Sequence, residues 1–126
     1  MISGSCECGA VAYEVRGELR PVIACHCTQC RKTSGHFWAA TKTATENLTL
    51  TRDEGLAWYR SSGTARRGFC KYCGSSLLWE KDGEGMTAIG AGTLDGATGL
   101  TTVQHIFVAD KGDYYDIADG LPQRAR

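Results

Sequence analysis

The seven cysteines of the chain fall into three short clusters, and this grouping constrains the fold more than any other feature. The clusters are a first pair, a triplet and a second pair: Cys6 and Cys8; Cys25, Cys27 and Cys30; and Cys70 and Cys73. Packing alone requires no such spacing, and an odd number of thiols cannot pair completely as disulfides. We therefore interpret the clusters as metal ligands or catalytic thiols, and keep a disulfide framework as the less favoured alternative.

Length and charge narrow the class of protein. The 126 residues suit one domain, 1–126, large enough to bury a core and small enough to gain stability from bound metal. The 14 basic and 14 acidic residues balance and form no basic stripe, so no nucleic-acid partner is expected. The N-terminus has no charged leader, and no run of about eighteen apolar residues occurs. We therefore expect a cytoplasmic protein without a membrane partner, and the sequence predicts no particular oligomeric state.

Short segments of β-forming residues recur along the whole chain and predict an all-β domain of short antiparallel strands. Val11, Tyr13 and Val15 alternate with smaller or charged residues, which is a typical strand pattern. One helical turn is expected at residues 31–35, with glycine as its stop. The predicted strands are residues 10–15, 22–24, 37–41, 48–51, 56–60, 68–70, 76–80, 87–91 and 103–108.

The first and second pairs have the spacing of two zinc knuckles. Each pair is followed at once by glycine, Cys8 by Gly9 and Cys73 by Gly74. Glycine allows the backbone to take a positive φ there, which turns amides toward the sulfurs as the next strand begins. Four thiolates from two distant knuckles form the usual tetrahedral structural zinc site. Two unrelated buried pairs are the plainer alternative.

The triplet is one ligand short of a complete tetrahedron. A zinc site with three protein ligands keeps a fourth position for water or substrate, and this distinguishes catalytic from structural sites. A thiol bound there would be deprotonated and able to attack a carbonyl carbon. The alternative is a closed structural site, completed by a histidine. The candidates for that ligand are His26, His36 and His105.

Basic residues stand beside the cysteines. Arg31 and Lys32 directly follow the triplet, and Arg66 and Arg67 come shortly before the second pair. Such cations favour thiolate over thiol and can hold the carboxylates of a substrate. We name Arg31, Lys32 and Arg66 as candidate substrate-binding residues. Ordinary solvated surface is the simpler interpretation of adjacent basic residues.

Five motifs, in a fixed order, span nearly the whole chain. They are Gly4-x-Cys6-x-Cys8-Gly9, Cys25-His26-Cys27-x-x-Cys30-Arg31-Lys32-x-Ser34-Gly35, Phe69-Cys70-x-x-Cys73-Gly74-Ser75, Gly92-Thr93-Leu94-Asp95 and His105-Ile106. Together they resemble the glutathione-dependent formaldehyde-activating enzyme family, a group that also contains centromere protein V-type proteins. The motifs are specific in both spacing and order.

The resemblance implies a single domain of this type with a β-tent fold, stapled by zinc, that holds two zinc ions per chain. It implies a carbon–sulfur lyase that joins formaldehyde to glutathione, or to another small thiol, giving S-hydroxymethylglutathione. The structural-zinc ligands it implies are Cys6, Cys8, Cys70 and Cys73. The catalytic-zinc ligands it implies are Cys25, Cys27 and Cys30. This division agrees with the one drawn from spacing.

Two non-enzymatic functions remain as alternatives. The first is a non-catalytic, zinc-stapled module that binds glutathione or a protein partner. The second is a nucleic-acid or cytoskeletal adaptor, which the balanced charge and the absence of a basic segment before Cys6 disfavour.

Serine substitutions test the two predicted roles separately. In Cys30→Ser, zinc content should fall from about two ions per chain toward one while the fold persists, because the triplet holds the catalytic ion. In Cys73→Ser the domain should unfold, because structural zinc binding is part of the folding free energy. Metal analysis with circular dichroism measures both quantities. Equal loss of structure in the two variants would contradict the division.

Overall fold

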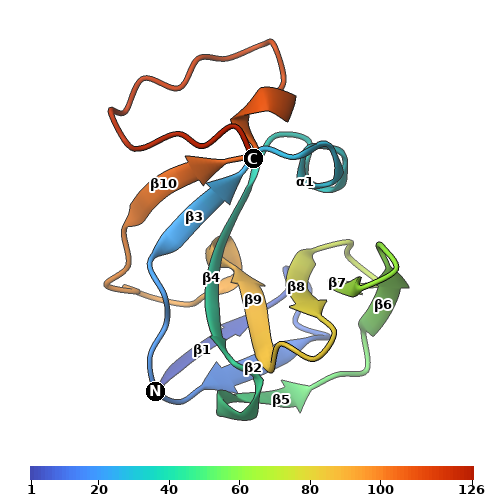
Figure 1. The fold of residues 1–126 in the computed structure, drawn as a ribbon. Helices are drawn as coiled ribbons and strands as arrows, with labels where there is room; N and C mark the ends of the chain where they lie inside the picture. Colours follow the sequence, from blue (N-terminus) through green and yellow to red (C-terminus); the bar gives the residue numbers. More distant parts are fainter.

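The computed structural model describes residues 1–126 and contains two open β-sheets and one α-helix (Figure 1). The smaller sheet has the strand order β1 (Ile2–Ser5), β2 (Ala12–Val15), β5 (Leu48–Arg52). The larger has the order β10 (Thr102–Ile106), β3 (Val22–Cys25), β4 (Trp38–Ala44), β9 (Met86–Gly90), β8 (Ser76–Lys81), β7 (Ala65–Cys70), β6 (Leu56–Arg60). The helix is α1 (Thr28–Ser34), and short 3₁₀ helices cover Thr45–Asn47, Ala91–Thr93 and Val108–Asp110. None of these helices has the length and apolar character needed to cross a membrane.

The all-β prediction is confirmed, with one difference in strand direction. All neighbouring strands pair antiparallel except β10, which runs parallel to β3, with His105 opposite Ala24 and Ile106 opposite Cys25. Two parallel strands need a crossover connection. Here the connection from β3 to β10 comprises α1, strands β4 to β9 and the loop before β10. Because β3 and β10 point the same way, the residues that follow the two strands leave the sheet at the same end (Figure 1).

The main core joins the two sheets. In β2, Tyr13 and Val15 are buried while their neighbours are partly exposed, which confirms the alternation predicted for this strand. Their side chains pack in one cluster with Leu77 of β8 and Ile89 of β9, both fully buried. Burial of such side chains, at about 1.5–3 kcal/mol each, is a main source of stability. A second, smaller cluster surrounds Trp38 and includes sulfurs of the triplet.

Element boundaries differ from prediction at three places that matter for the site. Strand β1 was not predicted, because three of its four residues are serine or glycine; it forms by pairing with β2. Helix α1 begins at Thr28, earlier than predicted, so that Cys30 lies inside it, and Gly35 ends it with φ of 82° as expected. Strand β10 stops at Ile106, because Phe107 takes a left-handed φ of 54°.

Candidate metal centres

The first and second pairs of cysteines meet although 62 positions separate Cys8 from Cys70. Their four Sγ atoms all lie within 4.8 Å of one another. Cys8 Sγ is 3.7 Å from both Cys6 Sγ and Cys70 Sγ. A tetrahedron of sulfurs around zinc has edges of about 3.8 Å, from a Zn–S length of about 2.3 Å. A disulfide requires about 2.0 Å, and all seven cysteines are free. The donor set therefore fits a tetrahedral thiolate metal site.

Backbone geometry at the two knuckles matches the expectation from sequence. Gly9 has φ of 84° and Gly74 has φ of 81°, so both glycines take the left-handed conformation. The Gly74 N–H donates to the Cys70 carbonyl at 2.8 Å, closing the second knuckle. The Val11 N–H donates to Cys6 Sγ at 3.3 Å, which supports a thiolate at that position.

Ser75 links the two knuckles, a role that the sequence reasoning did not identify. The Glu7 N–H, between the two cysteines of the first pair, donates to Ser75 Oγ at 3.0 Å. That hydroxyl lies 3.2 Å from Cys73 Sγ and can donate to it, since its oxygen is already accepting. Hydrogen bonds from the Ser75 hydroxyl and from the backbone of Cys8 and Ser75 lower the pKa of the Cys73 thiol to about 5. The serine directly after Gly74 was the only sequence signal.

The triplet forms a second sulfur group at the C-terminal end of β3. The Sγ atoms of Cys25, Cys27 and Cys30 lie within 4.8 Å of one another. Cys25 ends β3, and Cys27 is the N-cap of α1, with its Sγ accepting from the Cys30 N–H at 3.3 Å. Residues three apart on a helix share a face, so the cap places Cys30 beside Cys27. These soft donors at this spacing also fit zinc.

The three histidines have other partners. His26 Nε2 lies 2.9 Å from His105 Nδ1, and His26 Nδ1 is hydrogen-bonded to the Tyr115 hydroxyl. His36 is exposed, with Nδ1 3.4 Å from the Tyr114 hydroxyl. No histidine nitrogen joins the sulfur group of the triplet. The structure therefore gives no support to the alternative in which a histidine completes this site.

Arg67 is the cation that contacts the triplet. Its Nη2 donates to Cys30 Sγ at 3.2 Å and its Nε to Gln29 Oε1 at 2.6 Å. Its guanidinium lies 5.5 Å from the centre of the Trp38 ring. A hydrogen bond from Cys25, together with the charge of Arg67, lowers the pKa of the Cys30 thiol to about 6. Arg67 thus offsets part of the negative charge of the sulfur group.

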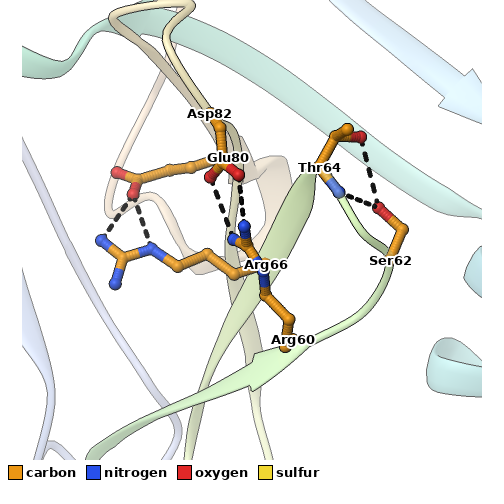
Figure 2. Close-up of polar contacts among 6 residues, drawn as sticks. All are labelled: Arg60, Ser62, Thr64, Arg66, Glu80 and Asp82. Carbon is orange, nitrogen blue, oxygen red and sulfur yellow. Dashed lines mark hydrogen bonds and ion pairs between the residues drawn. The ribbon is translucent and has the colours of Figure 1, made fainter.

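The three basic residues predicted to bind substrate lie in different surroundings. Arg31 and Lys32 are on α1; Lys32 is exposed, and Arg31 has a buried Nε without a hydrogen-bond partner. Arg66 donates to Glu80 Oε1 from Nη2 at 2.8 Å and from Nε at 3.1 Å (Figure 2). Neighbouring residues of a strand point to opposite faces, so Arg66 faces away from the sulfurs that Arg67 contacts. Sequence alone did not distinguish these two arginines.

Two adjoining clefts lie between α1 and the turn after Cys73, and no cysteine lines either of them. The larger, of about 370 Å³, is lined by α1 residues, by Trp38 and by the turn after Cys73. The smaller, of about 290 Å³, is lined by Arg67 and by Trp38. The lining shared by both clefts consists of Thr33, Trp38, Gly74 and Ser76. Clefts of this size suit a small molecule, and these lie between the elements that carry the two sulfur groups.

Comparisons with known proteins agree with this geometry. Residues 1–110 match the family model described as glutathione-dependent formaldehyde-activating enzyme. A protein of Schizosaccharomyces pombe (strain 972), named as an uncharacterized lyase, is 29% identical over 121 residues, which cover 92% of this chain and 85% of that protein. The crystal structure of a Rhodobacter sphaeroides protein superposes with a TM-score of 0.65 at 27% identity, covering 76% of this chain and 90% of that chain.

Ser75→Ala tests the link between the knuckles. Removing the hydroxyl that bonds Cys73 Sγ should weaken metal binding at the four-cysteine group by about 10- to 100-fold. Zinc affinity, measured by competition with a chromophoric chelator, should remain unchanged at the triplet. Ser62→Ala is the matched control, because its exposed hydroxyl bonds only Thr64 (Figure 2). Equal weakening at both sulfur groups would contradict the assigned role.

Proposed function

Because the chain belongs to the glutathione-dependent formaldehyde-activating enzyme family, we propose that it is a lyase-type enzyme that joins formaldehyde to the thiol of glutathione. The single observation that carries the proposal is the triplet, a group of three cysteine sulfurs without a fourth protein ligand, in contact with Arg67, which lines the smaller cleft. The printed name of the Schizosaccharomyces pombe relative, a lyase, supports the same reaction type. A small thiol other than glutathione remains the alternative substrate.

Zinc is the metal that the donor sets favour. In this proposal Cys6, Cys8, Cys70 and Cys73 hold a structural ion, and Cys25, Cys27 and Cys30 hold a catalytic one. When bound at the triplet, zinc would favour the thiolate form of a thiol that takes the fourth ligand position.

The reaction requires little acid or base from the protein. The glutathione thiol loses its proton to solvent, and its sulfur forms a bond to the formaldehyde carbon. The electron pair of the carbonyl moves to oxygen, which takes a proton from water to give the hydroxymethyl group. Atoms and charge balance without a further co-reactant, so the protein mainly orients the partners and stabilises charge.

Arg67 is the residue placed to stabilise the developing alkoxide. Its Nη2 and Nε are occupied by Cys30 and Gln29, whereas Nη1 has no partner in the protein. Arg67 lines the smaller cleft, and its Nη1 keeps some exposure to solvent. A fixed cationic donor beside a thiol site is suited to an oxygen that gains negative charge.

Carboxylates of glutathione would lie toward α1 in this proposal. Arg31 and Lys32 follow the triplet there, and Thr33 and Ser34 of the same helix line the larger cleft. The Arg66 guanidinium is already paired with Glu80, so a glutathione carboxylate would have to compete with that ion pair.

Exchange NMR between free formaldehyde and S-hydroxymethylglutathione tests the proposed function. The zinc-loaded protein should raise the exchange rate in proportion to its concentration, and Cys30→Ser should return the rate to the uncatalysed background. Glutathione binding without faster exchange, with both metal groups filled, would favour the non-catalytic binding module instead.

Arg67→Gln refines this experiment. Loss of the donor should lower the catalysed rate by roughly 100- to 1,000-fold, the effect typical of removing one donor to an oxyanion. Arg60→Gln is the matched control, because Arg60 pairs with Asp82 on the surface (Figure 2). An unchanged rate in Arg67→Gln would remove Arg67 from the mechanism and leave the reaction itself standing.

A further inference from the structure

The segment after β10 folds back over the edge that carries the triplet. Figure 1 shows it as a long loop beyond the ends of β3 and β10, near α1. Its return is fixed by backbone hydrogen bonds to β10, where the His105 N–H donates to the Pro122 carbonyl at 2.9 Å and the Arg124 N–H to the His105 carbonyl at 2.9 Å. Residues 111–126 lie beyond the range that matches the family model.

Two side chains of this segment, those of Asp119 and Tyr115, lie at the two ends of a series of four hydrogen-bonded groups. Asp119 Oδ2 lies 2.7 Å from His105 Nε2, and His105 Nδ1 lies 2.9 Å from His26 Nε2. The Tyr115 hydroxyl bonds the remaining nitrogen, His26 Nδ1. His26 is fully buried and His105 nearly so, at 0% and 5% exposure, so both nitrogens of each ring need a partner.

With both rings uncharged, the carboxylate at one end fixes the direction of every hydrogen bond in this series. A carboxylate only accepts, so His105 donates through Nε2 to Asp119 and accepts at Nδ1 from His26. His26 then accepts at Nδ1 from the Tyr115 hydroxyl. Each ring nitrogen and the phenol are satisfied with both histidines uncharged.

His26 determines where the sulfurs on either side of it point. Cys25 is in β3, and Cys27 has an extended backbone with φ of −61° and ψ of 158°. In extended backbone, successive side chains point to opposite sides. With the His26 ring held on one side by hydrogen bonds at both nitrogens, Cys25 and Cys27 are directed to the other, toward Cys30.

The same segment also contacts the far end of the triplet's helix. The Tyr114 hydroxyl donates to the Gly35 carbonyl at 3.2 Å, at the residue that caps α1. Lys111 Nζ donates to the Tyr115 carbonyl at 2.5 Å and lies 4.7 Å from the centre of its ring, which orders the loop around Tyr115. Residues 111–120 therefore hold both ends of the stretch that carries the triplet.

We propose that residues 111–120 position the three sulfurs of the triplet, and that Tyr115 is a positioning residue which acts through His26. Tyr115 touches neither the sulfurs nor the proposed substrates in this role. The inference rests on the metal-binding role proposed for the triplet, but its test does not depend on turnover.

Tyr115→Phe removes one hydroxyl and leaves His26 Nδ1 buried without a donor. Affinity for the ion at the triplet, measured by chelator competition with zinc and with cobalt, should fall about 10- to 100-fold, as for other groups that orient a ligand. The four-cysteine group of the same molecule is the internal reference and should bind unchanged. Tyr59→Phe is the matched control for metal affinity, measured without substrate because Tyr59 lines the smaller cleft. Tyr59 is 57% exposed, and its hydroxyl makes no hydrogen bond within the protein.

A measurement with the triplet empty separates this inference from the proposed function. In the Cys30→Ser background, which is expected to keep its fold with only the four-cysteine group filled, Tyr115→Phe should speed amide hydrogen exchange across residues 25–35 and leave β2 and β8 unchanged. Unchanged affinity at the triplet and unchanged exchange would overturn the inference, as would equal weakening of both metal groups. A wild-type protein that binds two ions without catalysing exchange of formaldehyde would overturn the proposed function alone.

Discussion

The meeting of four cysteine sulfurs from two distant knuckles is the constraint on which the rest of the structure depends. It fastens the turn before β2 to the turn between β7 and β8, and so sets the smaller sheet against the larger. The sulfur spacing of 3.7 Å is that of a tetrahedral metal site and is too long for a disulfide. Because these four cysteines form one group, no cysteine remains to serve as a fourth ligand for the other three.

The triplet differs from the four-cysteine group in its surroundings as well as in its number of ligands. Backbone amides and Ser75 support the four-cysteine group, as suits a site that only holds structure. A buried arginine, Arg67, contacts the triplet and lines the smaller cleft, and the hydrogen-bonded His26 stands between Cys25 and Cys27 in the sequence. A buried cation is costly unless it has a partner, and the partners of Arg67 are Gln29 and a sulfur of the triplet, so its charge is directed at the triplet. This contrast is the physical basis for assigning the proposed reaction to the triplet.

Sequence predicted what local spacing determines and missed what depends on distant pairing. The strand pattern, the Gly35 helix stop and the left-handed Gly9 and Gly74 are local features, and all were confirmed. The choice between Arg66 and Arg67 depends on which face of β7 meets α1, which the register of the larger sheet decides. The parallel placement of β10 and the contact of Tyr115 with His26 depend on topology, across 89 positions in the latter case. No local pattern in the tail indicated either.

The most direct test of the central claim, that the triplet offers one position to a substrate thiol, is cadmium NMR of the cadmium-substituted protein. The chemical shift of bound cadmium reports the number of thiolates around it, because sulfur is a much softer ligand than oxygen. We predict two resonances, one typical of four thiolates and one of three. Glutathione should move only the second, to the four-thiolate region. Two four-thiolate resonances before glutathione is added, or a second resonance that glutathione does not move, would contradict the account.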